Sequence, residues 1–172
     1  ERFRSYLFDD YLPFLDRHVI DRQYGGFIWN VTPQGKVVST GKRIWYEGRG
    51  IWVYSFLYNE FGREAKHLEV ARKSIELLMK TRPGGDALWP VSIDREGRPA
   101  APPDREIYGD LFIAEGLAQY YRATREERWW KMATDIVRKC VRIYDRPDYN
   151  PQIGQTYQIG RASCRERVSN CV

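Results

Sequence analysis

One stretch organises this chain: Lys42-Arg43-Ile44-Trp45-Tyr46-Glu47-Gly48-Arg49-Gly50-Ile51-Trp52. Because Trp45, Arg49 and Trp52 are spaced i, i+4 and i+7, they share one face of the helix that this stretch begins. A guanidinium needs partners for its N–H donors, and the flat faces of indole rings supply none. This face therefore fits a pocket wall that stacks against a polyol and hydrogen-bonds to it. The alternative is an arginine lying across aromatic rings that belong to the core.

Apolar periodicity and helix-stop signals predict an all-α chain with short β-hairpins. The predicted helices are 2–19 with a kink at Pro13, 43–61 ending at Gly62, 64–80, 107–122, and a last helix that starts at the capping box Thr124/Glu127 and reaches about 143. The predicted hairpins are 27–31 with 36–38, and 88–93 returning through Arg98. After the first helix, the predicted order of elements is therefore hairpin, helix, helix, and this order occurs twice.

The second half of the chain repeats the first at an offset of 62 residues without gaps. The matched pairs are Gly35 with Gly97, Tyr46 with Tyr108, Tyr58 with Tyr120, Glu64 with Glu126, and Ala71 with Ala133. Each unit exposes an apolar face that only a neighbouring unit can cover, so such units stack into a solenoid or close into a ring. A closed ring of paired helices is an α/α toroid, and its pocket belongs at the mouth that carries the hairpins.

Composition and charge narrow the function classes. The chain has 172 residues, a net charge of +5 and 42% hydrophobic residues, which suffices for one globular domain. Acids and bases are interspersed, so nucleic acid is not an expected partner. No run of apolar residues is long enough for a membrane span.

Cys140 has no internal partner in the body of the chain, which fits a reducing, cytoplasmic location. The first residue is Glu1, so a removed signal peptide stays open.

Four segments carry a resemblance to a known family: 21–27, 45–52, 107–112 and 116–124. In this order they resemble the N-acylglucosamine 2-epimerase family, which includes cellobiose 2-epimerases and aldose-ketose isomerases. The resemblance covers residues 1–158 and implies an N-terminal part of an (α/α)6 barrel. It also implies chemistry on a ring-opened sugar: a proton leaves the carbon next to the carbonyl, an enediolate forms, and the proton returns.

The resemblance implies roles for particular residues. Arg49 matches the family's arginine after the aromatic-rich segment, and Tyr108 matches the tyrosine of its Tyr-Gly motif. The expected site is Arg49 as the catalytic residue, with Tyr108, Trp45, Trp52, Trp89, Asp110 and Glu47 binding the sugar substrate. The family has glutamine where Glu47 stands, and cellobiose-type members have glutamine where Asp110 stands. These two differences leave the identity of the sugar substrate undecided. No metal and no cofactor is expected, and a homodimer of the full-length protein is compatible with the resemblance.

The chain is expected to be incomplete. The family takes its base from histidines of later helices, whereas His18 and His67 are expected to have surface or packing roles. Residues 159–172 resemble a translated sequencing adapter, so they form a non-native tail outside the barrel segment. The fragment alone should be inactive. The alternatives are a glycoside hydrolase or lyase on a similar toroid, with Asp104, Glu106 or Asp110 as an acid, and a non-catalytic scaffold or binding protein.

Overall fold

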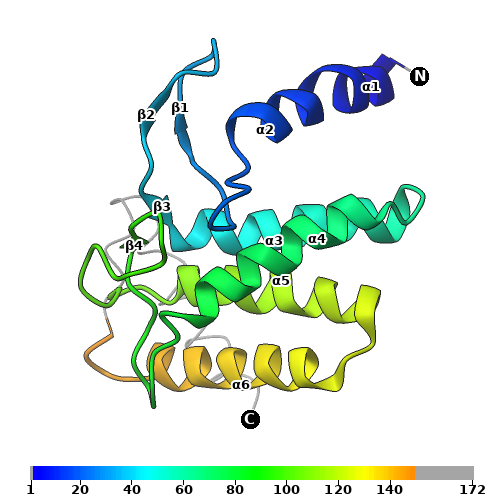
Figure 1. Ribbon diagram of the computed structural model, residues 1–172. Coiled ribbons are helices and arrows are strands. Elements are labelled where there is room, and N and C mark those ends of the chain that lie inside the picture. Colours follow the sequence, from blue (N-terminus) through cyan, green and yellow to red (C-terminus); the bar gives the residue numbers. More distant parts are fainter. Residues whose placement is uncertain (1, 150–172) are drawn as a thin grey trace.

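The computed structural model describes residues 2–149, which form tandem helical pairs with short strands at one end (Figure 1). The elements are α1 (Arg2–Ser5), the π-helix η1 (Tyr6–Tyr11), α2 (Leu12–His18), β1 (Asn30–Val31), β2 (Val37–Ser39), β3 (Lys42–Arg43), α3 (Ile44–Glu60), α4 (Ala65–Met79), β4 (Ser92–Ile93), α5 (Tyr108–Thr124) and α6 (Glu127–Tyr144). The predicted helices are confirmed, with small shifts at their ends. The tail 159–172 lies outside the described residues.

The N-terminal helical segment accommodates its proline through a π-helical segment. Pro13 lies in the first turn of α2, where its missing N–H costs least. Just before it, the N–H of Leu12 donates to the carbonyl of Leu7, five residues back, and closes η1. The kink predicted at Pro13 therefore appears as a π-helical segment just before the proline.

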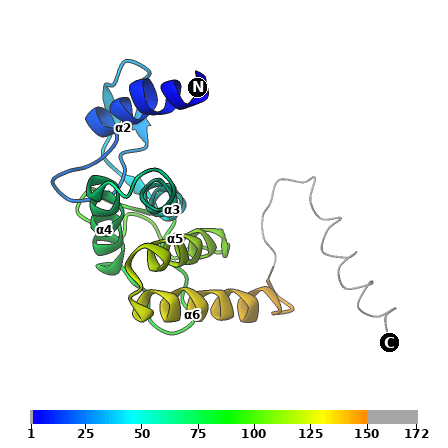
Figure 2. The same ribbon diagram turned by 90° about the vertical axis from the view of Figure 1, so that its right-hand side faces the viewer.

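Helices α3 and α5 lie side by side, and each is followed by a partner, α4 or α6, that runs back alongside it (Figures 1 and 2). Glycines bring the backbones of α3 and α5 close together. A Cβ on Gly48 would lie 2.5 Å from the carbonyl carbon of Phe112, and one on Gly116 would lie 2.6 Å from the carbonyl oxygen of Gly48. Only glycine allows two helices to approach this closely.

The backbone confirms the repeat of 62 residues. Gly35 and Gly97 both end tight turns with positive φ, at +85° and +97°. Arg63 and Arg125, which connect the helices of each pair, are both left-handed, with φ of 57° and 60°. The two units therefore share their turns as well as their helices.

The strands pair as predicted, with one addition. The first hairpin is confirmed as β1 with β2, antiparallel and with an irregular register. In the second, the returning chain pairs with the 88–93 segment through the antiparallel bridges Ile93–Pro99 and Pro90–Pro103, and β3 also pairs with β4, matching Lys42 with Ile93. The returning segment is rich in proline, which has no N–H to donate to a ladder, so it pairs through isolated bridges and forms no continuous strand. The predicted return through Arg98 is therefore confirmed, and the pairing of β4 with β3 is an addition that the sequence did not predict.

The capping box predicted at Thr124 and Glu127 is wrong. The residue that caps α6 is Glu126, and its N–H donates to the Thr124 hydroxyl at 3.3 Å. The Glu127 carboxylate instead accepts from the hydroxyl of Tyr121 at 2.9 Å. Arg125, in the left-handed conformation, ends α5 and places Thr124 in the preceding helix.

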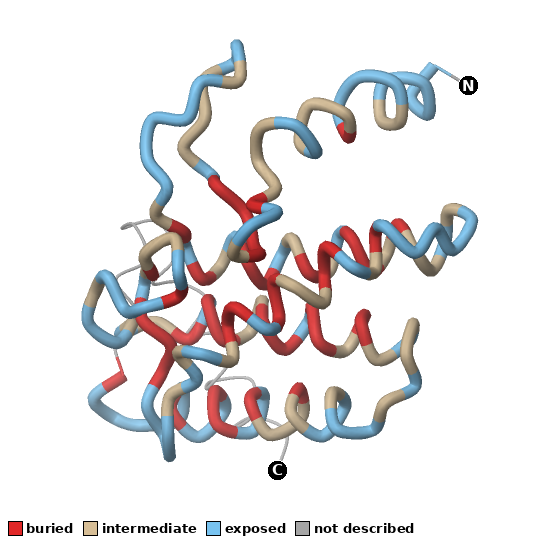
Figure 3. The backbone as a smooth tube through the Cα atoms, in the orientation of Figure 1, coloured by how far each residue is buried: buried red, intermediate tan, exposed pale blue. Residues whose placement is uncertain are grey.

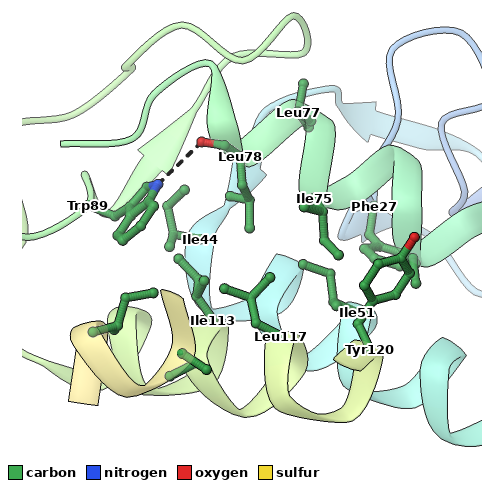
Figure 4. Packing of buried hydrophobic residues seen from close by; sticks show 14 of the residues in the cluster. Phe27, Ile44, Ile51, Ile75, Leu77, Leu78, Trp89, Ile113, Leu117 and Tyr120 are labelled. Atoms are coloured by element: carbon green, nitrogen blue, oxygen red, sulfur yellow. Dashed lines mark hydrogen bonds between the residues drawn. The ribbon is translucent and has the colours of Figure 1, made fainter. Parts of the chain in front are cut away.

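The core lies among α3, α4, α5 and α6 (Figure 3). Its centre includes Ile51, Leu78, Ile113 and Leu117, none of which has exposed area (Figure 4). Cys140 is buried and forms no disulfide within residues 2–149. Within residues 2–149, every helix is too short or too polar to cross a membrane.

Candidate functional site

The structure places Arg49 on an exposed aromatic wall near the N-terminal end of α3. Its guanidinium carbon lies 5.6 Å from the ring centroid of Trp45, one turn earlier on α3. It also lies 5.4 Å from the ring of Phe112 on α5. The Arg49 side chain is exposed, and within residues 2–149 it makes neither a hydrogen bond nor an ion pair. Its N–H donors are therefore available to a ligand.

Among the described residues, Trp52 continues this face of α3 without a cation–π contact to the Arg49 guanidinium. Its indole stacks on Phe56, with centroids 4.9 Å apart and planes 8° apart, and it is half-buried. Trp45 is also half-buried and lies 6.2 Å from the ring of Phe112. This face of α3 therefore carries two separate aromatic contacts, Trp45 with Phe112 and Trp52 with Phe56. Of these four rings, only those of Trp45 and Phe112 lie under the Arg49 guanidinium.

Tyr108 is the first residue of α5 and lies one turn before Phe112, on the same face of that helix. It is 41% exposed, so its hydroxyl can reach a ligand. Burial, with the negative charge of Glu106 as a smaller cause, raises the pKa of Tyr108 above its ordinary value. The hydroxyl therefore keeps its proton at neutral pH and can donate a hydrogen bond.

Glu47 lies in the interior, between α3 and α4. Its carboxylate has no exposed area and accepts hydrogen bonds from the backbone N–H of Phe27, at 2.8 Å, and from the Ser74 hydroxyl, at 2.6 Å. Burial raises the pKa of Glu47 to about 7, although both hydrogen bonds and the charge of Lys42 oppose this change. The carboxylate ties the first hairpin to both helices.

Asp110 and Trp89 form the corresponding interior contact in the second unit. The Asp110 carboxylate accepts the backbone N–H of Trp89 at 3.0 Å and pairs with the Lys139 ammonium on α6 at 2.5 Å. Burial raises the pKa of Asp110, against the opposing effect of Lys139. The Trp89 indole is 2% exposed and donates to the carbonyl of Leu78 at 3.4 Å (Figure 4).

The structure therefore places three of the expected site residues in the interior. Glu47, Asp110 and Trp89 are enclosed by protein, and protein groups occupy their polar atoms. The reason is helical geometry: Glu47 lies two residues from both Trp45 and Arg49 and so points to a different side of α3. We assign structural roles to these three side chains. The expected residues that remain on the exposed wall are Arg49, Tyr108, Trp45 and Trp52.

A buried ion pair that the sequence analysis missed fixes the chain just before α3. Lys42 has no exposed area, and its ammonium lies 3.1 Å from the Asp21 carboxylate and 2.9 Å from the carbonyl oxygen of Arg95. Arg95 also donates from Nε to Asp21, at 2.8 Å. This cluster joins the loop before β1 to the turn after β4. The signal available in the sequence was a lysine at the point where the polar hairpin meets the apolar helix.

The two histidines do not lie on the aromatic wall. His18 packs against Phe14, with ring centroids 4.9 Å apart. His67 is buried, with 4% exposed, and its ring lies 5.9 Å from that of Tyr54. Both have packing roles, and burial lowers the pKa of His67.

A hollow lies between the segment before α5 and the C-terminal end of α6. Its volume is about 800 Å³, and its lining includes Asp104 and Glu106 together with Leu88 and Ile143. Arg49 is not among the residues that line it. Two of the acids considered for a hydrolase are thus in a different place from the aromatic wall.

Together, the fold and the wall define the class as a segment of an (α/α)6 barrel with an exposed arginine at the hairpin end of an inner helix. The family model "N-acylglucosamine 2-epimerase (GlcNAc 2-epimerase)" matches residues 12–160, so the chain belongs to this family. It is 29% identical over 139 residues to the human N-acylglucosamine 2-epimerase and 27% identical over 128 residues to the cellobiose 2-epimerase of Dictyoglomus turgidum.

These matches cover 77% and 67% of the chain but only 32% and 30% of the two relatives. The chain therefore spans about a third of the length of the curated relatives it matches. Two solved structures share the fold. A sugar epimerase from a ruminal bacterium matches with a TM-score of 0.72 at 22% identity, over 80% of this chain and 35% of that one. The cellobiose 2-epimerase from Bacillus thermoamylovorans matches with 0.69 at 23% identity, over the same shares.

Proposed function

We propose that the full-length protein is a sugar 2-epimerase or aldose-ketose isomerase that moves a proton next to the carbonyl of a ring-opened sugar through an enediolate. The observation that carries the proposal is the Arg49 guanidinium, exposed on an aromatic wall and without a hydrogen bond or ion pair within residues 2–149. Family membership and the names of the relatives support the substrate class.

In this proposal Arg49 stabilises the oxyanion that develops as the proton leaves. A fixed cation placed where negative charge builds up is worth more in the transition state than in the ground state. Tyr108 donates a hydrogen bond to the sugar. The rings of Trp45 and Trp52 stack against the apolar face of the sugar. The base that moves the proton comes from the part of the barrel beyond this segment, so the 172-residue chain alone is inactive. A homodimer of the full-length protein remains a prediction.

The test measures exchange of the substrate's C2 hydrogen with solvent deuterium by the full-length protein. Arg49→Ala should slow this exchange about 100-fold or more, since removing one oxyanion donor typically costs that much. The control is Arg43→Ala, a neighbouring exposed arginine whose guanidinium lies over Trp29. Exchange that persists unchanged in Arg49→Ala would rule out the proposed role, as would an equal loss in Arg43→Ala.

A further inference from the structure

We propose that Phe112 is a positioning residue for Arg49, a role that rests on the proposed function. The guanidinium carbon of Arg49 and the ring centroids of Trp45 and Phe112 form a triangle with sides of 5.4, 5.6 and 6.2 Å. The guanidinium therefore lies over the notch between two tilted rings. Both ring faces attract the positive charge.

The two rings hold Arg49 in different ways. Trp45 belongs to the same helix, so it moves with the arginine and cannot fix it relative to the rest of the barrel. Phe112 belongs to α5 and is, among the described residues, the only partner on another element with which the Arg49 guanidinium makes a hydrogen bond, ion pair or cation–π contact. The position of the cation relative to Tyr108, one turn before Phe112, thus depends on this ring.

The backbone makes Phe112 a rigid support. Gly48, the residue before Arg49, lies against the main chain of Phe112 so closely that a Cβ there would be 2.7 Å from the carbonyl oxygen of Phe112. Gly116, one turn later on α5, lies equally close to the carbonyl oxygen of Gly48. The two helices cannot slide here without a clash, so the Phe112 ring keeps its place under the guanidinium.

This arrangement also determines where the arginine's donors point. The side of the guanidinium that faces the rings meets no hydrogen-bond acceptor, so its N–H groups find partners only on the open side of the wall. An arginine already ordered in this way loses less rotamer freedom when it binds an oxyanion. Phe112 therefore contributes to the rate through Arg49 and does not itself touch the reacting atoms.

The test compares Phe112→Leu with Phe61→Leu in the full-length protein. Phe61 is a matched control because it also lies under a guanidinium, that of Arg4 at 5.9 Å, but at the opposite end of α3. Phe112→Leu should lower kcat for C2 exchange about tenfold with little change in KM, and Phe112→Tyr should restore it. Phe61→Leu should leave kcat unchanged.

Two further measurements separate positioning from general destabilisation. In NMR spectra, Phe112→Leu should shift the Arg49 Nε–H signal toward that of a solvent-exposed arginine, whereas Phe61→Leu should not. In the Arg49→Ala background, Phe112→Leu should have no further effect on the residual exchange. If Arg49→Ala leaves exchange intact, the proposed function fails. If Arg49→Ala abolishes exchange but Phe112→Leu changes neither kcat nor the Arg49 signal, or lowers exchange equally in both backgrounds, the positioning role alone fails.

Discussion

Glu47 and Asp110 make the same contact in the two units of the repeat. Each carboxylate is buried near the start of an inner helix and accepts the backbone N–H of the residue that leads into its hairpin, Phe27 at 2.8 Å and Trp89 at 3.0 Å. Each also contacts the following outer helix, through Ser74 or Lys139. The two carboxylates thus fix each hairpin to its helical pair.

Replacing Glu47 should change how stability depends on pH. The pKa of about 7 in the folded state exceeds the ordinary value of 4.5, so the folded state holds its proton more tightly than the unfolded state. Between these values the unfolded state binds fewer protons, and the free energy of unfolding therefore falls as pH rises from 4.5 to 7. The stabilisation is fully present below 4.5 and lost above 7.

The measurement is urea unfolding of the chain and of Glu47→Gln at pH 4.5 and 7.5. The chain should lose about 3 kcal/mol more than the variant between these pH values, because glutamine cannot ionise. Glu115→Gln, at an exposed position on α5, should behave like the unchanged chain. Identical pH profiles for the chain and Glu47→Gln would contradict this assignment.

Asp110→Asn should destabilise the chain by about 3 kcal/mol at pH 7. The asparagine can still accept from Trp89, but the ammonium of Lys139, whose side chain is 8% exposed, is left without its countercharge. The matched control is Asp135→Asn, which breaks the exposed pair with Lys131 on α6 and should have little effect. Thermal and urea unfolding measure both variants, and equal stabilities would show that the buried pair contributes no more than the exposed one.

Gly48→Ala should cost about 2 kcal/mol or more in the free energy of unfolding. The added methyl group would meet the main chain of Phe112, which cannot move aside as a flexible side chain would. Gly84→Ala is the control, because a Cβ there meets no atom within 4 Å. The prediction fails if both substitutions leave the urea midpoint unchanged.

The outer surface of α5 and α6 should bind a hydrophobic dye. A groove of about 460 Å³ runs between these helices, lined largely by apolar residues that include Leu111, Trp130 and Val137. We expect the 172-residue chain to bind anilinonaphthalene sulfonate and to unfold over a broad temperature range, because such a groove lacks the neighbour that a repeat requires. Val137→Lys should reduce the fluorescence, and Val38→Lys, on the exposed strand β2, should not. A sharp transition without dye binding would contradict this prediction.

The fold was largely predictable because its signals are local. Apolar spacing located α3 to α6, and glycines marked the turns, since Gly35 and Gly97 need a positive φ that other residues rarely adopt. The spacing of Trp45 and Arg49 also predicted their shared face, which helical geometry alone determines. The sequence did not predict that Glu47, Asp110 and Trp89 are buried, because the position of a residue in a motif does not show which side chains other elements cover.

The sequence by itself determined the helices, the turns, the repeat and the face that carries Arg49, since each depends on neighbours within a few residues or on a fixed offset. Only the tertiary structure decided that β3 pairs with β4, that Glu47 corresponds to Asp110, and that Phe112 lies under Arg49. In the gapless alignment of the repeat, Glu47 is matched with Gly109 and not with Asp110, the next residue. Glutamate is one methylene longer than aspartate, and both carboxylates accept the corresponding backbone N–H. Contacts between distant segments depend on how closely glycines let the helices approach, and periodicity does not encode that distance.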